Sequence, residues 1–196
     1  MILKIRQVGE EILRQKARAL SPDEILDRST QELIEWMRET MHDAPGVGLA
    51  APQIGYSLQL VVIEDQAEFI EKLPPEQVAE RERRPVPFHV LINPKLTLLD
   101  VDSAEFFEGC LSLAGFTAVV PRARQVRVES LNERAEPVTI EATGWYARIL
   151  QHEIDHLGGV LYVDRMNSRT FFTQDNYVRH WKDRAVAEAT GYDELG

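Results

Sequence analysis

The feature that most constrains the fold is an uninterrupted helical pattern at residues 145–157. This run contains neither proline nor glycine, and Gly158 and Gly159 follow it directly. Because glycine commonly ends a helix, the pattern predicts a helix that stops at these two residues. The apolar positions of the run are Ala147, Ile149, Leu150, Ile154 and Leu157. Other elements must cover a helix this apolar, so we expect it to lie at the centre of the fold.

Two histidines lie in this helix, within the sequence His152-Glu153-Ile154-Asp155-His156. A spacing of four residues places both imidazoles about one turn apart on one helix face, where they can bind a single divalent ion. Glu153 lies beside the first histidine, where its carboxylate can reach a water on that ion and act as a general base. The pattern is also compatible with two structural histidines. Against that reading, buried imidazoles without partners would carry an unmet polar cost.

A hydrolytic metal site needs a third protein ligand and a fourth position left open for water. Cys110 is the natural candidate because it is the only thiol in the chain, and the neighbouring Gly109 lets the backbone approach closely. Taken alone, Cys110 is also typical of a small buried apolar residue. One thiolate with two imidazoles suits Fe(II), Co(II), Ni(II) or Zn(II) and does not select among these metals.

A glycine-rich segment at residues 45–55 contains three glycines and one amide side chain, Gln53. Gly46 and Gly48 permit backbone angles and approach distances that other residues do not, so this segment can bring backbone close to a ligand. The Gln53 amide can donate a hydrogen bond to the oxygen of a polarised carbonyl. Taken alone, the segment is more typical of a plain glycine-rich turn, because glycine clusters are common and no phosphate-loop pattern is complete here.

Apolar and β-branched runs predict the strands. Residues 59–63 and 90–92 are short apolar runs typical of buried strands, and residues 126–131 and 138–142 alternate apolar and polar side chains as a half-buried hairpin does. With the central helix, these runs predict an α+β fold of short, mainly antiparallel strands packed around that helix, followed by a C-terminal helix. We expect residues 1–196 to form a single domain, because the chain is long enough for one sizeable core.

The remaining segments are helical or irregular. The pattern Ser29-Thr30-Gln31-Glu32 resembles a helix-opening capping box, and apolar residues recur at helical spacing from there until Pro45. Residues 66–87 contain four prolines and a charged run, which predicts an exposed loop with room for one short helix. Residues 171–189 have mixed helical character, and residues 192–196 form a polar tail.

Charge and composition argue against several classes of function. Lys and Arg total 22 against 32 Asp and Glu, so the formal net charge is -10. This charge opposes attraction to nucleic acid or anionic lipid, so we expect neither a nucleic-acid nor a membrane partner. No apolar run approaches the roughly 20 residues of a membrane helix, and residues 1–6 lack the layout of a signal peptide, so we expect a cytoplasmic location. One cysteine excludes an internal disulfide.

Three separated segments together resemble the peptide deformylases. That family is marked by a Gly-x-Gly-x-Ala-Ala-x-Gln loop, a Glu-Gly-Cys-x-Ser strand end and a His-Glu-x-x-His helix. This chain has all three in that order, at residues 46–53, 108–112 and 152–156. The match extends from the N-terminal residues to about Met166, and three motifs in this order are far more specific than any one of them.

The resemblance implies an enzyme that removes the N-formyl group from the N-terminal methionine of nascent polypeptides and releases formate. The implied metal ligands are Cys110, His152 and His156. The implied metal is Fe(II) in the cell, with Zn, Ni or Co as replacements in a preparation. Glu153 would transfer protons, and the Gln53 amide with the backbone N–H of Leu111 would stabilise the oxyanion.

The resemblance also implies a substrate site. Gly48 would offer backbone contacts to the substrate, and the pocket for the methionine side chain would be lined by Val47, Trp145, Arg148 and Ile149. The last three lie on the helix face that carries the first histidine. The expected partners are N-formylmethionyl peptides and nascent chains near the ribosome.

Two departures from the common bacterial pattern leave the pocket shape open. Trp145 stands where many bacterial members have a smaller aliphatic residue, and Ala114-Gly115-Phe116 is similar to the subgroup that includes organellar enzymes.

Other classes of protein can use the same helix. A zinc endopeptidase would cleave internal peptide bonds and would need neither Cys110 nor Gln53. A metal-binding interaction protein without catalysis would have no use for Glu153. A structural zinc domain would need a fourth ligand, yet the chain has no other cysteine and its remaining histidines, at positions 42, 89 and 180, lie in unrelated contexts.

Overall fold

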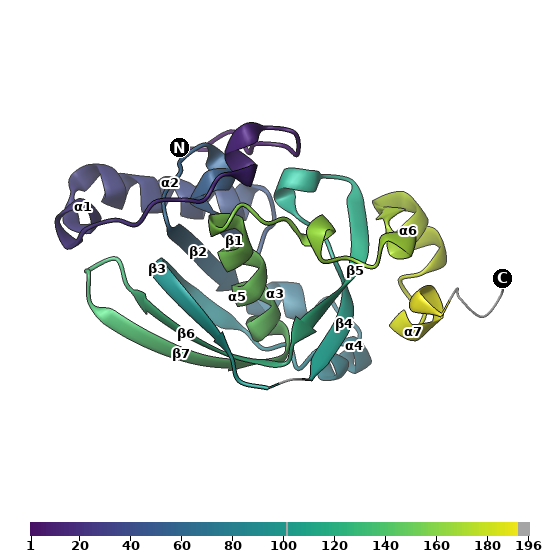
Figure 1. Ribbon diagram of the computed structural model, residues 1–196. Coiled ribbons are helices and arrows are strands. Elements are labelled where there is room, and N and C mark those ends of the chain that lie inside the picture. The colour runs from purple at the N-terminus through teal and green to yellow at the C-terminus, as the bar shows by residue number, and fades with distance from the viewer. Residues whose placement is uncertain (101, 192–196) are drawn as a thin grey trace.

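The structure is a computed structural model that describes residues 1–100 and 102–191 (Figure 1). Its α-helices are α1 (Pro22–Leu26), α2 (Arg28–Asp43), α3 (Ala67–Ile70), α4 (Pro75–Glu80), α5 (Gly144–Leu157), α6 (Gln174–His180) and α7 (Val186–Thr190). Its strands are β1 (Gly48–Ala50), β2 (Leu60–Asp65), β3 (Val86–Leu98), β4 (Ser103–Glu108), β5 (Phe116–Ala123), β6 (Gln125–Leu131), β7 (Pro137–Thr143) and β8 (Phe172–Thr173). Short 3₁₀ helices connect them at Glu11–Arg14, Ala51–Ile54, Leu111–Leu113, Tyr162–Asp164 and Ser168–Thr170.

An antiparallel five-stranded sheet in the order β1-β2-β3-β6-β7 separates the two longest helices. Successive side chains of a strand point to opposite faces, and β2 follows this rule. Val61 and Ile63 pack in the cluster that includes the apolar face of α5, whereas Leu60 and Val62 pack in the cluster that includes α2. Because β2 is buried on both faces, its residues 60–63 are all apolar instead of alternating between apolar and polar.

The strand predictions are confirmed, with differences in length. The predicted runs at residues 59–63 and 90–92 lie in β2 and β3, and β3 is much longer than its apolar centre because its ends also pair with β2 and β6. The predicted hairpin is β6 and β7, with buried side chains alternating along β6. The glycine-rich segment contains the edge strand β1, which the sequence alone did not distinguish from a turn.

A second, three-stranded sheet in the order β4-β5-β8 lies beside α5, as Figure 1 shows. The C-terminal helical segment packs against it but is divided into α6 and α7. The division allows residues from both helices to reach the same apolar cluster around Phe107 and Val119. The α+β class, the antiparallel strands and the helical C-terminus are therefore as predicted. The polar tail predicted at residues 192–196 lies outside the described residues.

The capping prediction for α2 is wrong in its position. Asp27 is the N-cap residue, and its carboxylate accepts a hydrogen bond from the backbone N–H of Ser29. The reciprocal capping box lies earlier, at α1, where Ser21 and Glu24 exchange side-chain and backbone hydrogen bonds. Aspartate caps a helix as well as serine does, so α2 begins at the first available acceptor.

The excursion at residues 66–87 is more ordered than predicted. It contains two short helices, α3 and α4, rather than one, and its last two residues belong to β3. The C-terminal part of the excursion is fixed to the end of β2 by a two-bonded salt bridge between Arg83 and Asp65. The prolines therefore start a helix and enter a strand instead of marking a free loop.

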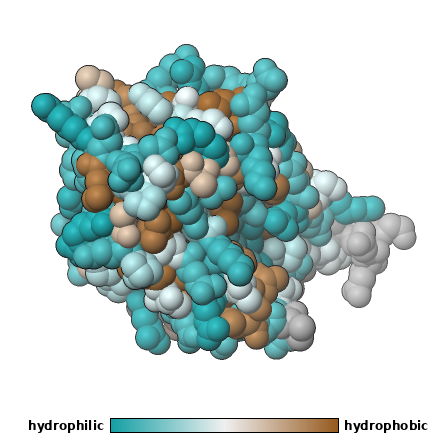
Figure 2. Space-filling view, turned by 60° about the vertical axis from the view of Figure 1, so that its left-hand side comes forward, coloured by the Kyte–Doolittle hydropathy of each residue, from teal (hydrophilic) through white to brown (hydrophobic). Residues whose placement is uncertain are grey.

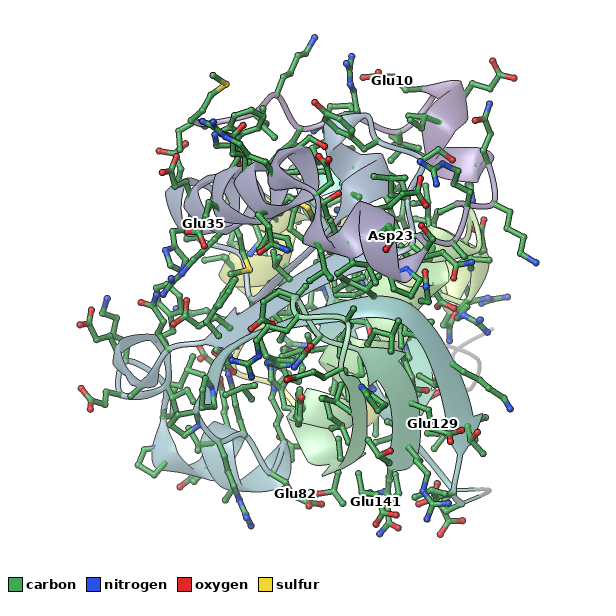
Figure 3. The ribbon with its side chains drawn as sticks, turned by 90° about the vertical axis from the view of Figure 1, so that its left-hand side faces the viewer. Glu10, Asp23, Glu35, Glu82, Glu129 and Glu141 are labelled. Atoms are coloured by element: carbon green, nitrogen blue, oxygen red, sulfur yellow. The ribbon has the colours of Figure 1, made fainter. Side chains whose placement is uncertain are left out.

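The surface is mixed in polarity and acidic. On the face drawn in Figure 2, hydrophobic and hydrophilic residues are interspersed. The acidic residues labelled in Figure 3, among them Glu35, Glu129 and Glu141, lie at the periphery of the molecule. In the described part of the chain, no helix has both the length and the apolar character that crossing a membrane requires.

Candidate metal centre

The helix α5 carries both histidines, about one turn apart, with Glu153 between them. Its position after Thr143 and its end at Gly158 agree with the sequence prediction. His156 is fully buried, Glu153 is nearly so, and the His152 and His156 ring centres lie 5.0 Å apart. The burial of His156 and the close approach of the two rings do not fit two unrelated surface histidines.

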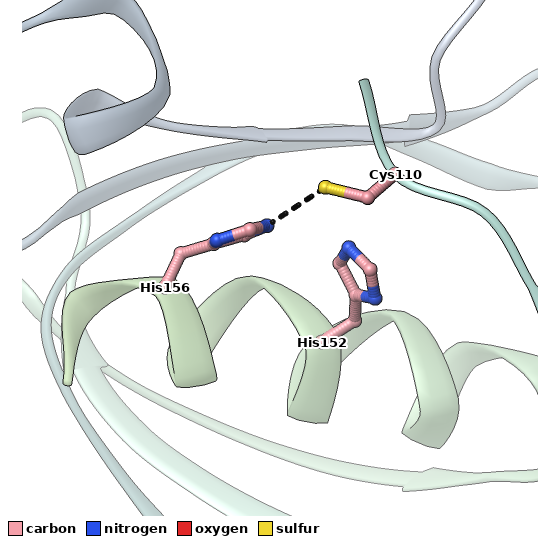
Figure 4. A group of neighbouring side chains, drawn as sticks. All are labelled: Cys110, His152 and His156. Atoms are coloured by element: carbon pink, nitrogen blue, oxygen red, sulfur yellow. Dashed lines mark hydrogen bonds between the residues drawn. The ribbon is translucent and has the colours of Figure 1, made fainter. Parts of the chain in front are cut away.

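Cys110 approaches this helix from the end of the second sheet. It follows β4 and immediately precedes the 3₁₀ helix Leu111–Leu113. Its Sγ lies 3.3 Å from Nε2 of His156, and Figure 4 shows the thiol and the two imidazoles converging. One ligand atom from each of Cys110, His152 and His156 lies within 4.8 Å of the others. This donor set of one sulfur and two nitrogens fits a single transition-metal cation and leaves a coordination position open.

Glu108 orients His152 within the cluster. The Nδ1 of His152 lies 3.0 Å from Oε2 of Glu108, so this nitrogen donates to the carboxylate and the other nitrogen is left to face the thiol. Burial alone would raise the pKa of Glu108, but the hydrogen bond from His152 and the charge of Arg122 hold it well below its usual range. The carboxylate is therefore ionised, which favours a fixed orientation of the ring.

Two buried arginines complete the charge balance around Glu108. Arg122 donates to both carboxylate oxygens, with distances of 3.0 Å, and Arg148 donates to one of them and to the carbonyl of Val120. Arg122 also donates to Asp155, one turn along from the first histidine. Sequence reasoning placed Arg148 in a substrate pocket and did not single out Glu108 or Arg122. The position of Glu108, two residues before the only cysteine, was the available signal.

Gly48 makes room for the Glu153 carboxylate. A Cβ atom at Gly48 would lie 2.4 Å from Oε1 of Glu153, a distance that real side chains do not reach. Because Gly48 lies in the edge strand β1, the glycine allows the strand to pass directly over the carboxylate. Glu153 Oε2 is buried and has no hydrogen-bond partner within the described residues, and burial raises the pKa of Glu153 to about 7.

The Gln53 side chain is held with its amide nitrogen toward the cluster. Its oxygen accepts a hydrogen bond of 2.8 Å from the backbone N–H of Ala50. Its nitrogen lies 3.3 Å from Oγ of Ser112 and 3.5 Å from Sγ of Cys110. The amide N–H groups are thus fixed beside the thiol, where they can donate to an atom bound there.

A cavity of about 640 Å³ opens beside these groups. Its walls include every predicted site residue except His156, which lies beneath the cavity against the thiol. The predicted residues in the walls are Val47, Gly48, Gln53, Cys110, Leu111, Trp145, Arg148, Ile149, His152 and Glu153. Phe116 and Gln174 also line the cavity, and sequence reasoning gave neither of them a role.

A family model described as polypeptide deformylase matches residues 2–171. The chain belongs to the polypeptide deformylase family. Among curated deformylases, it is 46% identical to peptide deformylase 1A, chloroplastic, of Solanum lycopersicum over 172 residues, which are 88% of this chain and 62% of that protein. It is 44% identical to peptide deformylase 3 of Streptomyces avermitilis over 189 residues, which are 94% of this chain and 82% of that protein.

A solved deformylase supports the same assignment at the level of the fold. The Met-Ala-Ser-bound class I type b peptide deformylase from Acinetobacter baumannii matches with a TM-score of 0.75 and 30% sequence identity. The match covers 85% of this chain and 99% of that one. The deformylase resemblance and the α+β class are therefore confirmed. The similarity to a chloroplastic deformylase also agrees with the predicted likeness to the organellar subgroup.

Proposed function

We propose that this deformylase-family chain hydrolyses the N-formyl group of the N-terminal methionine of nascent polypeptides, with formate as the released product. The observation that carries the proposal is the convergence of Cys110, His152 and His156 beside Glu153 at the wall of an open cavity. Membership of the family and the Met-Ala-Ser peptide bound by the similar structure support the substrate class.

The proposed metal ligands are Cys110, His152 and His156. A divalent cation bound there would act as a Lewis acid toward the formyl oxygen and would lower the pKa of a bound water. We propose Fe(II) in the cell, as the resemblance to the deformylases implies. Zn, Ni or Co can replace it in a preparation, because a mixed thiolate and imidazole set accepts all four.

Glu153 is proposed to move the proton. Its buried and unpartnered Oε2 can accept a proton from the attacking water. As the C–N bond of the formamide breaks, the same oxygen can deliver that proton to the leaving amine. One water molecule is consumed, and the products are formate and a free N-terminus.

Two N–H donors are proposed to hold the oxyanion that forms on the formyl oxygen. The Gln53 amide nitrogen is fixed beside Cys110 by the bond between its oxygen and Ala50. The backbone of Leu111 follows the cysteine directly and lines the same cavity. Donors that are already oriented can stabilise developing charge without reorganisation.

The side chain of the terminal methionine is proposed to enter the cavity beside α5. Val47, Trp145 and Ile149 provide apolar walls there, and Gly48 offers the backbone of an edge strand. The side chain of Arg148 also lines the cavity, but its guanidinium is engaged by Glu108.

We further propose that the partners are N-formylmethionyl peptides and nascent chains near the ribosome, in the bacterial cytoplasm. Similarity to the Streptomyces avermitilis deformylase over most of this chain supports the bacterial part of this proposal. Contact with nascent chains would require no direct binding of nucleic acid, which the net charge of -10 disfavours.

Formate release from formyl-Met-Ala-Ser by anaerobically purified, metal-analysed protein tests the proposal. The wild type is expected to release formate and to leave an N-blocked internal peptide intact, which a zinc endopeptidase would cut. Glu153→Ala is expected to keep its metal and to lose about 10²- to 10⁴-fold in turnover, because the proton-transfer group is missing. Glu141→Ala, an exposed carboxylate on β7, is the matched control. Near-normal turnover of Glu153→Ala would refute the proposed role.

A further inference from the structure

The end of the excursion, residues 81–83, lies directly on the first turn of α5. The backbone N–H of Trp145 donates a hydrogen bond of 2.8 Å to the carbonyl of Arg81. Gly144 has a φ of +59°, and a Cβ there would lie 2.5 Å from Cβ of Glu82. Only glycine fits this conformation and this contact without strain, so the close approach of the two segments is built into the sequence.

Two guanidinium groups from these residues lie against the Trp145 indole. The Cζ of Arg81 is 4.9 Å and the Cζ of Arg83 is 5.3 Å from the ring centre. Both distances fall within the range of cation–π attraction. The indole Nε1 is buried and has no hydrogen-bond partner within the described residues. Stacking and apolar contacts therefore hold the ring, and no hydrogen bond from its N–H fixes it.

The same arrangement continues to the charge network of the metal centre. Arg81 lies 5.6 Å and Arg148 lies 5.2 Å from the ring centre of Phe106. Guanidinium groups and aromatic rings thus follow one another from Arg83 through Trp145 to Arg148, which bonds Glu108. A rearrangement at residues 81–83 would therefore change the positions of the side chains along this series of contacts.

This series of guanidinium and aromatic contacts is fixed at its outer end, at Arg83. Both nitrogens of the Arg83 fork, Nε and Nη2, lie 2.8 Å from the Asp65 carboxylate oxygens. The Asp65 side chain is fully buried, and that of Arg83 is 11% exposed. A buried bidentate pair has a fixed geometry, so Arg83 cannot leave the indole without breaking it.

We propose that Arg81 and Arg83 determine the side-chain specificity of the cavity by fixing Trp145 as one of its walls. The inference rests on the proposed function, because it takes this cavity to be the site of the first side chain. With the indole held on two guanidinium groups, the wall is rigid, and the cavity admits a slender, unbranched side chain such as that of methionine in preference to an aromatic one. If these contacts are weakened, the indole can move and the preference falls.

The test compares formate release from formyl-Met-Ala-Ser and formyl-Phe-Ala-Ser. Arg81→Met keeps the aliphatic stem but removes the charge over both rings, and the ratio of the two kcat/KM values is expected to fall about three- to tenfold, from an increase in the phenylalanine value. Arg83→Lys keeps a cation but loses the paired bond to Asp65, and a smaller fall in the same direction is expected. Arg84→Met, an exposed neighbour that does not line the cavity, is the control and should match the wild type.

The ratio separates specificity from folding and from the proposed function. A variant that is merely less stable loses both rates together and leaves the ratio unchanged. Ratios within twofold of the wild type in both Arg81→Met and Arg83→Lys would overturn the inference while leaving formate release intact. A wild-type protein that releases no formate from formyl-Met-Ala-Ser would instead contradict the proposed function, and this inference with it.

Discussion

Charged residues occupy two contrasting environments in this molecule. Around Glu108, the side chains of Glu108, Arg122 and Arg148 are each exposed by 4% or less. On the hairpin, Arg127 and Glu141 form an ion pair with side chains exposed by 47% and 60%. Burying a charge costs several kcal/mol per ion before the pairing is counted, so the buried cluster of Glu108, Arg122 and Arg148 adds little net stability. The difference indicates that the inner charges serve to position His152, whereas the outer ones serve mainly solubility.

Glu108→Gln is expected to have the largest effect of the substitutions that compare buried with exposed charges. The substitution keeps the shape of the side chain but leaves the buried Arg148 without its carboxylate partner and the buried Arg122 with Asp155 alone. A loss of about 3–5 kcal/mol in the free energy of unfolding is expected. Urea denaturation of the metal-loaded protein measures it. A loss below about 1 kcal/mol would mean that the cluster is as weakly coupled as a surface pair.

Removal of the metal is expected to have the next largest effect. A cation that binds the folded state alone, at a hundred times its Kd, stabilises that state by about 2.7 kcal/mol. A chelator should therefore lower the Tm of the wild type, and Cys110→Ala should lose most of this sensitivity because a ligand is missing. Ser112→Ala, beside the cluster but outside the donor set, is the control. Equal chelator sensitivity in Cys110→Ala would exclude the thiol as a ligand.

Asp155→Asn tests the boundary between the two environments. Asp155 joins the buried Arg122 to the half-exposed Arg165, and its own side chain is 14% exposed. Loss of its charge-assisted hydrogen bonds is expected to cost about 1.5–3 kcal/mol in the free energy of unfolding, less than at Glu108. Arg165→Gln should cost less than Asp155→Asn in the same denaturation series. The reverse order would show that solvent exposure does not govern these energies.

Asp27→Ala is a pH-dependent test on the surface. Hydrogen bonds from the Ser29 hydroxyl and backbone N–H lower the pKa of Asp27. A lowered pKa favours the ionised form in the fold, so the stabilisation is present at neutral pH and is lost as the pH falls through that pKa. The Tm should be modestly lower in Asp27→Ala near pH 7, and the difference should shrink below about pH 4. If the Tm difference between the wild type and Asp27→Ala did not change with pH, the charge of Asp27 would not be the source of the stabilisation.

The smallest effect is expected at the hairpin pair. Glu141→Gln breaks the bond with Arg127 in a region open to solvent and salt, so the free energy of unfolding should change by no more than about 0.5 kcal/mol. The same urea series measures this change. A cost that approached that of Glu108→Gln would erase the distinction between inner and outer charges.

Local patterns predicted the elements with strong periodicity. The helix that carries His152 and the hairpin formed by β6 and β7 follow from repeats of 3.6 and two residues, and their ends follow from glycine and turn residues. The start of α2 was misplaced, because Asp27 and Ser29 offer similar caps and the helix begins at the earlier of the two.

The metal ligands could be proposed from the sequence, but the buried ion pairs that orient them could not. Cys110 was identified because it is the only thiol and because three motifs occur together. Glu108 belongs to one of these motifs, but its role appears only when the fold buries it between Arg122 and Arg148. Long-range pairing of this kind leaves no periodic trace, and the stacking of Arg83 on Trp145 was hidden for the same reason.

The contact between Gly48 and Glu153 limits how this sequence can diverge. The two residues lie far apart in the chain, yet the space that a methyl group would need at one is filled by the carboxyl group of the other. A larger residue at 48 would therefore require a shorter one at 153, and a shorter acid would no longer reach as far. The glycine at position 48 is thus a condition for a glutamate at position 153.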